Sequence, residues 1–411
     1  METVLKRDAC RLCGSKNVSQ IIDFDAVPFF DEVVTEENRG EEFSHQMAVY
    51  FCTDCRSVQS LHDVDLNLYY ESYNYSASAS KFVRDYMDSL VEYCFKTLEL
   101  RVNATVLEVG AADGYLLKVF QKNGARVLGF EPAANLCHLA ETQGVSLVQA
   151  LFTGETIDLI PADMRPIDLV VLLHTFDHLY DPSGFLEVVS KVLNPESGVL
   201  IIEVHDLSDI VSKSETALFG HEHATYLHVG SMERLLSRHG LRLIDANFLS
   251  KDQCRGSSML IAAVPFASSR GPLRDLDPFR ETELDKLDTF IEFRASVQRA
   301  FERLRLFVST KNEQGERIAG YGAWGRGVTT LAMAGFKAQD LVFVADRNED
   351  LHGHFTPVSS IPIVGPNEVT RQKVDVVIVF NYAYIDEITS DLASFIEEGG
   401  RVISVLELLT E

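Results

Sequence analysis

The sequence is short of positive charge and has no long apolar run. Lys and Arg together number 37 against 61 Asp and Glu, which leaves a formal net charge of −24 at pH 7. Because such a surface repels phosphate backbones, we expect no nucleic-acid partner. No stretch approaches the ~18–20 consecutive apolar residues that a membrane-spanning helix requires, so we expect no membrane partner either.

Cysteine is also scarce, and its arrangement argues against a disulfide framework. There are 7 cysteines, an odd number, and four of them form two CxxC pairs. This pattern favours metal ligation in a reducing compartment over disulfide bonding. The opening residues, METVLKRDACRLC, have no apolar signal-peptide region. We therefore expect a cytoplasmic protein.

What the sequence does contain indicates a globular protein of two or three domains. It has 411 residues, of which 46% are hydrophobic and 24% charged, close to globular averages. Residues 1–75 form short, turn-broken segments that are too few and irregular to fold by apolar burial alone. Residues 76–277 alternate buried strands with helices, and residues 278–411 begin with a charged helix and then alternate again.

The alternation predicts an α/β fold with two Rossmann-like units. In the central block we expect strands at 105–110, 126–131, 168–174 and 199–205. Helical segments between them predict a mostly parallel sheet covered on both faces. In the last block we expect strands at 317–327, 341–348, 375–381 and 401–408, which predict a second, smaller doubly wound unit.

The two CxxC pairs are Cys10 with Cys13 and Cys52 with Cys55. Each pair places two sulfurs on one tight turn, and four thiolates complete the tetrahedral coordination of zinc without an open position. A structural zinc would supply the stability that the first block lacks. The alternative is two unrelated pairs of buried cysteines.

A glycine-bounded turn follows the first strand of the central block, between Gly110 and Gly114, and the next strand ends at Glu131. An acidic residue at that point can accept both hydroxyls of a ribose. The turn lacks the GxGxxG spacing that places a pyrophosphate on a helix N-terminus, which indicates a ligand with a ribose but no phosphate. S-adenosylmethionine fits, with Asp113 at its amino-acid end; the alternative is a purely structural turn. The predicted cofactor-binding residues are Glu108, Gly110, Ala111, Asp113, Gly114, Glu131 and His174.

Histidines gather where strands end. His174 and His178 lie in HTFDH directly after the third central strand, and His205 ends the fourth. Ligands bind at the carboxyl edge of such sheets, so these residues predict a site there. The alternative is that they are hydrogen-bonded packing residues.

The densest titratable group is His221, Glu222 and His223. It lacks the HExxH spacing that places two imidazoles on one helix face, so we interpret it as acid–base machinery and not as a metal site. A histidine held by a neighbouring carboxylate can remove a proton next to a carbonyl. The alternative is a hydrogen-bonded loop cluster.

The last block opens with GYGAWGRG, after a strand and before a helix. This spacing permits phosphate binding at a helix N-terminus, and Arg326 adds a positive charge. Asp346 follows the next strand, where a ribose acceptor would lie. NAD, the nucleotide of a substrate and a scaffold without a ligand all remain compatible with this pattern.

Taken together, these motifs resemble the sugar C-methyltransferases that act on nucleotide-linked keto-deoxysugars. The resemblance extends over nearly the whole chain: the two CxxC pairs, LYYESYNYSAS, EVGAADG, HTFDH, HEH followed by Tyr226, YGAWGRG, ADRN and FNYAYIDEI. It implies a small zinc-binding N-terminal domain, a central class I methyltransferase domain of Rossmann-like fold that binds S-adenosylmethionine, and a C-terminal Rossmann-like domain that helps to hold the nucleotide sugar.

The resemblance also implies a mechanism, in which a proton is removed beside a ketone and the resulting enolate is methylated. His223 matches the family's base and Glu222 its partner. The full predicted catalytic set is His223, Glu222, His178, Tyr75 and His221, and the predicted substrate-binding set is Tyr226, Gly322, Trp324 and Arg326. We expect dTDP or another nucleoside diphosphate on the substrate, and a monomer or a small homo-oligomer.

The chain departs from the family at two positions. Gly220 stands where members usually carry Tyr, and Cys254-Arg-Gly-Ser257 replaces a GGS-like turn. The missing phenol leaves stabilisation of the enolate to another group, for which His221 and Tyr226 are candidates. O- or N-methylation of a related sugar, an NAD-dependent oxidoreductase and a zinc-containing assembly protein are the alternative functions.

Overall fold

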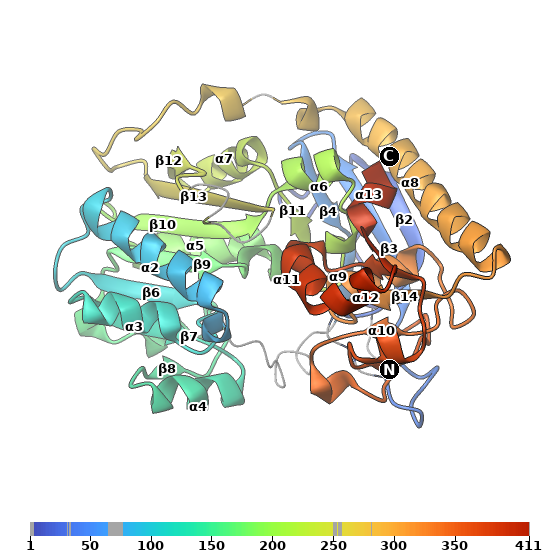
Figure 1. Cartoon of the computed structure of the whole chain (residues 1–411). Helices are drawn as coiled ribbons and strands as arrows, with labels where there is room; N and C mark the ends of the chain where they lie inside the picture. The colour runs from blue at the N-terminus through green and yellow to red at the C-terminus, as the bar shows by residue number, and fades with distance from the viewer. Residues whose placement is uncertain are drawn as a thin grey trace.

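A computed structural model describes residues 4–30, 32, 34–64, 77–249, 253, 257–280 and 282–410 (Figure 1). Tyr75 and Cys254 lie outside the described residues. Within the described part, the strands form three larger sheets and one strand pair. No helix among these residues is long and apolar enough to cross a membrane.

The first sheet, which we call the N-terminal sheet, is antiparallel and has the order β11-β4-β3-β2. Its strands are β2 (Val18–Val27), β3 (His45–Cys52), β4 (Ser57–Ser60) and β11 (Thr225–Tyr226). Beside it, β1 (Val4–Lys6) pairs with β5 (His62–Val64). Because β11 comes from the predicted central block, the sheet joins chain segments on both sides of the predicted boundary at residue 75, and that boundary stays a prediction.

The central sheet has seven strands in the order β12-β13-β10-β9-β6-β7-β8. They are β6 (Thr105–Val109), β7 (Arg126–Phe130), β8 (Leu147–Val148), β9 (Leu169–Leu173), β10 (Val199–His205), β12 (Leu241–Ala246) and β13 (Ser258–Pro265). β13 runs antiparallel to both neighbours, and the pairings among β10, β9, β6, β7 and β8 are parallel. The predicted mostly parallel sheet is therefore confirmed, with β13 as a strand that the sequence analysis did not identify.

Both faces of the central sheet are buried, because alternate apolar residues of one strand enter different cores. Val106 and Val171 pack with α2 (Lys81–Lys96) and α3 (Tyr115–Lys122), whereas Leu107 and Val170 pack with α5 (Pro182–Val192) and α7 (Val229–Arg238). This two-sided burial explains why the strands read as continuous apolar runs. The remaining helices of this part are α4 (Ala134–Thr142) and α6 (Leu207–Lys213).

The C-terminal part begins with the long helix α8 (Leu287–Glu313), which runs along one side of the molecule in Figure 1. Its sheet is parallel throughout, in the order β16-β15-β14-β17-β18. The strands are β14 (Ile318–Tyr321), β15 (Val344–Ala345), β16 (Ile363–Val364), β17 (Val376–Val379) and β18 (Arg401–Ser404), and the helices are α9 (Arg326–Met333), α10 (Glu368–Arg371), α11 (Ile385–Asp391), α12 (Ala393–Glu397) and α13 (Val405–Thr410). The predicted second Rossmann-like unit is confirmed.

Short 3-10 helices complete the described structure. They are η1 (Ala77–Ala79), η2 (Ile157–Leu159), η3 (Ala162–Met164), η4 (Phe176–His178), η5 (Thr216–Leu218), η6 (Asp277–Phe279), η7 (Glu283–Asp285), η8 (Glu349–Leu351) and η9 (Tyr382–Tyr384). Two of them, η4 and η5, carry or adjoin residues of the candidate active site.

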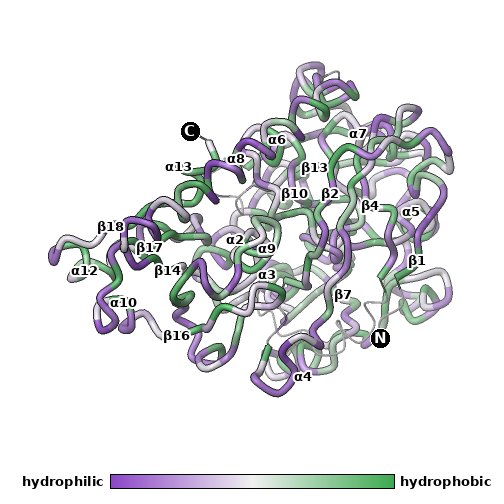
Figure 2. The backbone as a smooth tube through the Cα atoms, turned by 90° about the vertical axis from the view of Figure 1, so that its right-hand side faces the viewer, coloured by the Kyte–Doolittle hydropathy of each residue, from purple (hydrophilic) through white to green (hydrophobic). Residues whose placement is uncertain are grey.

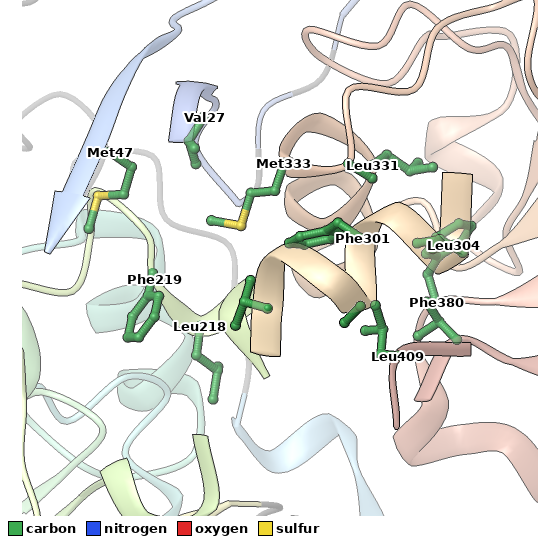
Figure 3. Packing of buried hydrophobic residues seen from close by; sticks show 14 of the residues in the cluster. Val27, Met47, Leu218, Phe219, Phe301, Leu304, Leu331, Met333, Phe380 and Leu409 are labelled. Carbon is green, nitrogen blue, oxygen red and sulfur yellow. The ribbon is translucent and has the colours of Figure 1, made fainter. Parts of the chain in front are cut away.

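One apolar core joins the N-terminal sheet, the loop at 218–219 and the C-terminal part. Figure 3 shows it: Val27 and Met47 of the N-terminal sheet lie across from α8, which contributes Phe301 and Leu304. Figure 2 shows the hydrophobic residues concentrated along the inner strands and the hydrophilic residues in the outer loops. The same core contains Leu218, Phe219, Leu331, Met333, Phe380 and Leu409. The loop that carries His221 and His223 is therefore anchored between separate parts of the chain.

Candidate active site and zinc site

The four predicted metal ligands come together at one point. The Sγ atoms of Cys10 and Cys55 are 3.6 Å apart, those of Cys13 and Cys52 are 3.7 Å apart, and all four lie within 4.8 Å of one another. A tetrahedral zinc with Zn–S bonds of about 2.3 Å requires sulfurs about 3.8 Å apart, so the donor set fits zinc. Gln59 Nε2 also donates to Cys10 Sγ at 2.9 Å, which orients that ligand from outside.

The predicted cofactor turn, residues 110–114, lies at the carboxyl end of β6. Gly110 has φ of 73°, and a Cβ built on it would lie 2.3 Å from Thr175 Oγ1. Gly114, also at φ 73°, is the N-cap of α3. Only glycine fits at position 110, and the turn therefore lies directly against the residue that follows His174.

Glu131 directly follows β7 and is hydrogen-bonded to the cofactor turn. It is 6% exposed, and its two carboxylate oxygens accept hydrogen bonds from the backbone N–H groups of Ala112 and Ala133, both at 2.9 Å. Burial raises the pKa of Glu131, although both backbone donors oppose this shift. A carboxylate has about four lone-pair sites, so about two remain for the hydroxyls of a ribose. This donor and acceptor chemistry fits the adenosyl group of S-adenosylmethionine.

The other predicted cofactor residues surround the same turn. Asp113 is fully buried, and its Oδ2 accepts a hydrogen bond from the backbone N–H of Ser78 at 2.9 Å. Ala111 and Glu108 are both 3% exposed, in the turn and in β6 respectively. Asp113 thus joins the turn to the segment that leads into α2, and its predicted contact with the cofactor stays a prediction.

Four histidines that are far apart in the sequence form one cluster, which we call the histidine cluster: His174, His178, His205 and His223. The ring centroids of His174 and His205 are 4.7 Å apart, as are those of His205 and His223. The rings of His178 and His223 are 4.9 Å apart. The prediction that the HTFDH histidines lie at the carboxyl edge is confirmed by their position after β9.

Asp177 lies in the middle of this cluster and is 2% exposed. Its Oδ2 accepts a hydrogen bond from His205 Nδ1 at 2.8 Å. Burial raises the pKa of Asp177, but that hydrogen bond and the nearby rings of His178 and His223 outweigh burial, so the pKa is well below its usual range. The carboxyl group is therefore ionised at neutral pH.

His223 is 4% exposed and has a defined orientation. Its Nδ1 is 2.8 Å from the carbonyl oxygen of Leu218, which can only accept a hydrogen bond, so the proton of the neutral ring is on Nδ1 and the lone pair is on Nε2. Burial lowers the pKa of His223, while Asp177 and the Leu218 carbonyl oppose the shift. The ring is thus a neutral acceptor at neutral pH, as a general base must be.

Glu222 does not make the hydrogen bond to His223 that the sequence analysis expected from a neighbouring carboxylate. Its Oε1 accepts a hydrogen bond from the backbone N–H of Phe30 at 2.7 Å. The Phe30 ring in turn packs edge-on against His223, with centroids 5.2 Å apart. Glu222 therefore fixes Phe30 beside the cluster, and the charged neighbour of His223 is Asp177.

His221 points away from the histidine cluster and into the N-terminal sheet. Its Nε2 lies 3.1 Å from the carbonyl oxygen of Val27 and 3.3 Å from that of His45. Burial lowers its pKa to about 4. His221 thus ties the loop to the N-terminal sheet, and its predicted catalytic role stays a prediction.

Tyr226, a predicted substrate residue, lies in the strand that joins the N-terminal sheet. It is 1% exposed in β11, and its hydroxyl donates to the carbonyl oxygen of Gly220 at 3.3 Å. Its predicted contact with the substrate stays a prediction.

The predicted substrate residues of the C-terminal part begin α9. Arg326 makes an ion pair with Glu215 at 2.5 Å and a hydrogen bond from Nη1 to the hydroxyl of Tyr382 at 2.9 Å. Trp324 is 37% exposed. Gly322 has φ of 98°, and a Cβ there would lie 2.8 Å from Asn381 Cβ. The structure thus brings Arg326 against the central part, and its predicted role in binding the substrate stays a prediction.

Sequence reasoning missed two residues of this site. Asp177 lies within HTFDH, between two histidines that the sequence analysis placed in the site, and this position was a usable signal. Phe30 carries no comparable signal, because its contact with His223 joins residues far apart in the chain.

Comparisons with known proteins agree with this organisation. A family model described as a zinc binding domain matches residues 10–70, one described as a methyltransferase domain matches residues 79–246, and one described as a C-methyltransferase C-terminal domain matches residues 273–406. The C-methyltransferase NovU of Streptomyces niveus is 28% identical over 401 residues, covering 96% of this chain and 94% of that protein. A ubiquinone biosynthesis O-methyltransferase of Xylella fastidiosa is 25% identical over 117 residues, covering 28% of this chain and 47% of that protein.

Two similar solved structures each cover less than half of this chain. An S-adenosylmethionine-dependent methyltransferase from Clostridium acetobutylicum has a TM-score of 0.35 at 14% identity and covers 46% of this chain and 93% of its own. Magnesium protoporphyrin IX methyltransferase from Synechocystis, with S-adenosylmethionine bound, has a TM-score of 0.33 at 16% identity and covers 45% of this chain and 80% of its own. These scores are too low to carry an argument about this chain.

The sequence matches and the geometry agree on the class of enzyme. The zinc ligands, the cofactor turn and the C-terminal unit fall within the three matched regions, in the same order. The C-terminal unit matches a C-methyltransferase domain, which favours the methyltransferase over the NAD-dependent alternative. The chain is an S-adenosylmethionine-dependent methyltransferase with a zinc-binding domain, and it is similar to C-methyltransferases along nearly its whole length.

Proposed function

We propose that the enzyme methylates a carbon atom next to the ketone of a nucleotide-linked keto-deoxysugar, and that His223 is the base that removes the proton from this carbon. The observation that carries the proposal is the orientation of His223. Its Nδ1 is engaged by the Leu218 carbonyl, which leaves the lone pair of Nε2 to accept a proton. The ring is buried, so a substrate bound there would react away from bulk water.

The proposed reaction has two steps. His223 Nε2 takes the proton from the carbon beside the ketone, and the C–H electron pair becomes the enolate. The enolate carbon then forms a bond to the methyl group, which S-adenosylmethionine supplies as an electrophile, and S-adenosylhomocysteine leaves as a neutral thioether. Proton removal makes the carbon nucleophilic, and binding both reactants in one site orients them. His223 finally releases its proton to solvent.

The position of the histidine cluster supports a site in which the cofactor turn holds the methyl donor and the cluster holds the sugar. Thr175 touches the cofactor turn at Gly110, and it directly follows His174 of the cluster. β6 and β9, which carry the turn and the cluster, are neighbouring parallel strands. A donor held at the turn and an acceptor held at the histidines would therefore meet without a large movement of the chain.

We assign the nucleotide of the substrate to the C-terminal part. A diphosphate needs a cation in a protein whose net charge is −24, and Arg326 supplies one at the first residue of α9. Coulombic repulsion from Arg326 also contributes to the lowered pKa of His223, after burial and the opposing effect of Asp177, so the two side chains interact. The partly exposed Trp324 offers an aromatic surface for a base.

We also propose that the protein works in the cytoplasm. The four zinc ligands, together with Cys94 and Cys137, are free of disulfides in the described part of the chain, as expected in a reducing compartment. A monomer or a small homo-oligomer would both accommodate the proposed site.

Deuterium exchange tests the proposal, because enolate formation does not require methyl transfer. The enzyme is incubated in D2O with S-adenosylhomocysteine and the 4-keto-deoxysugar linked to dTDP, GDP, CDP or UDP, and deuterium at the carbon beside the ketone is measured by NMR. We expect exchange with at least one nucleotide, and a loss of about 10²–10⁴-fold in His223→Asn. His138→Asn, which changes an exposed histidine of α4, serves as the matched control and retains exchange.

The second candidate, O- or N-methylation of a related sugar, predicts a different result. A hydroxyl or an amine needs no labile carbon-bound proton, so the enzyme would transfer methyl groups without any exchange. Turnover to an O- or N-methyl product, with His223→Asn fully active, would replace the proposal by this candidate.

A further inference from the structure

We propose that Asp177 and His205 form a positioning pair, in which the Asp177 carboxylate orients the histidine cluster and offsets the positive charge that His223 acquires when it takes a proton. This inference rests on the proposed function for the role of His223. Neither residue belongs to the catalytic set predicted from the sequence.

The first support is the geometry of Asp177. One carboxylate oxygen, Oδ2, accepts the hydrogen bond from His205 Nδ1 at 2.8 Å, and the backbone carbonyl accepts one from the N–H of Ala224 at 2.7 Å. The side chain therefore holds the end of β10, while the main chain holds the loop that carries His223. A single residue of η4 thus connects the two segments that bring histidines into the cluster.

The second support is the other carboxylate oxygen. Oδ1 of Asp177 is buried and makes no hydrogen bond within the described structure. One carboxylate oxygen of Asp177 and one ring nitrogen each of His178 and His223 lie within 4.8 Å of one another. The negative charge consequently faces both rings, although the hydrogen bond goes to His205.

The third support is the balance of charge around His223. Burial lowers the pKa of His205 to about 3 and that of His178 to about 4, so these rings are neutral at neutral pH and Asp177 carries the charge of the cluster. Arg326 of α9 adds a positive charge, and His174 lies at the end of β9. Of the nearby carboxylates, Glu222 is hydrogen-bonded to Phe30.

Two further carboxylates lie near these groups: Glu203 of β10 faces His174 at 3.3 Å, and Glu215 pairs with Arg326. Among these acidic groups, Asp177 is the one that opposes the effect of burial on the pKa of His223. A proton transferred to His223 creates a buried positive charge, which is costly without a nearby counter-charge. Asp177 supplies that counter-charge before and after the transfer.

The same atoms raise the alternative of a second metal ion. Ligand atoms of His174, Asp177 and His205 also lie within 4.8 Å of one another. The 2.8 Å between Asp177 Oδ2 and His205 Nδ1 is, however, a hydrogen-bond distance, and a metal on Nδ1 would displace its proton. We therefore favour the positioning pair, and metal analysis is part of the test.

The test compares Asp177→Asn and Asp177→Glu with the wild type in the exchange assay between pH 5 and pH 9. Without the carboxylate, the protonated form of His223 loses its counter-charge. We expect the acid limb of the exchange rate in Asp177→Asn to move to lower pH by about one unit or more. We also expect its plateau to fall by about 10- to 100-fold, because a weaker base transfers a proton more slowly. Asp177→Glu keeps the charge and retains the wild-type acid limb.

Asp168→Asn is the matched control. Asp168 is another buried carboxylate, and it precedes β9, whereas Asp177 follows that strand. Asp168 is 7% exposed and accepts the backbone N–H of Thr105 at 3.0 Å. Its removal lowers the thermal midpoint but leaves the acid limb unmoved. An unmoved limb in Asp177→Asn, with a plateau within twofold of the wild type, overturns the proposal. If Asp177→Asn does not fold, a displaced limb in Asp177→Glu overturns it instead.

Two further measurements separate this inference from its alternatives. A second metal equivalent in the wild type, lost in Asp177→Asn, would replace the positioning pair by a metal site. NMR titration of the ring of His223, assigned with His223→Asn, needs no substrate and should show a lower pKa in Asp177→Asn. Because the His223 titration needs no substrate, it tests the positioning pair even if no keto sugar exchanges deuterium. Failure of the proposed function can therefore be told apart from failure of the pair.

Discussion

Phe30 occupies the space that a side chain at Gly220 would need. A Cβ at position 220 would lie 2.5 Å from Cζ of Phe30, 2.7 Å from its Cε1 and 2.8 Å from Oε2 of Glu222. The Phe30 backbone is fixed on both sides, by its N–H to Glu222 and by its carbonyl, which accepts from the N–H of Gly325 at 3.0 Å. The space at Gly220 is thus filled by the Phe30 ring, which packs edge-on against His223.

Gly220→Ala should therefore destabilise the protein, because the Phe30 ring and the Glu222 carboxylate would have to shift to admit the added Cβ. We expect a cost of about 1–3 kcal/mol in the free energy of unfolding. The measurement is a double-mutant cycle in urea with Phe30→Ala. The cost at position 220 should shrink when the ring is absent, and strictly additive costs would show that the two positions are independent.

Gly110→Ala should abolish the response to the cofactor. The added Cβ meets Thr175 and requires a backbone conformation that favours glycine, so the turn has to shift. We expect the thermal stabilisation by S-adenosylhomocysteine, which follows from mass action, to disappear in this variant. Gly144→Ala is the matched control, because Gly144 also has a positive φ, of 82°, but nothing lies within 4 Å of its Cβ position. An equal loss of response in both variants would show only general backbone strain.

Cys13→Ser should remove the zinc and weaken the N-terminal sheet that its ligands join. We expect zinc to fall from about one equivalent per chain towards zero, and the thermal midpoint to fall by roughly 5–10 °C. Metal analysis and calorimetry measure these two quantities. Cys137→Ser, at a half-buried cysteine that donates to the Glu131 carbonyl at 3.3 Å, should retain the zinc. Full zinc content in Cys13→Ser would contradict the assigned ligand set.

Stability should fall as the pH is lowered from about 6.5 towards 4, before most carboxyl groups titrate. Burial lowers the pKa of His178, His221 and His228 to about 4 each and that of His205 to about 3. In the unfolded chain these residues take up protons near pH 6.5, whereas in the folded protein they stay neutral. Each of these histidines therefore lowers the free energy of unfolding by up to about 1.4 kcal/mol per pH unit between its folded-state pKa and about pH 6.5. Above about pH 6.5 this cost is absent.

His228→Asn tests this reasoning, because asparagine can replace the capping role of His228 at the start of α7. The variant should show a shallower loss of unfolding free energy between pH 6.5 and pH 4.5, with zinc content checked at each pH. His138→Asn removes an exposed histidine and should retain the wild-type slope. Identical slopes in all three proteins would rule out His228 as a contributor.

The sequence predicts local features of this fold well and tertiary neighbours less well. The strands β6, β9 and β10 follow from their apolar runs, and the zinc ligands follow from the spacing of Cys10 and Cys13 with the second pair. The pairing of β11 with β4 has no local signal, because a two-residue strand has no periodicity to detect. Such pairings depend on contacts between distant segments.

The same distinction applies to the candidate site. His223 and His178 follow from motifs, but the carboxylate that faces His223 could not be chosen from sequence proximity. Glu222 adjoins it in the chain and bonds elsewhere, whereas Asp177 reaches it because Ala224 binds the Asp177 carbonyl. Likewise, the buried position of Tyr226 results from β11 joining a sheet whose other strands come from the first block.

A crystal structure of the enzyme with S-adenosylhomocysteine and the nucleotide keto sugar tests the central claim most directly. We expect the ribose on Glu131, the sulfur directed from the cofactor turn towards the histidine cluster, and His223 Nε2 within hydrogen-bond reach of the carbon beside the ketone. Density for the homocysteine compound away from residues 110–114, or a sugar bound where His223 cannot reach it, would contradict the account.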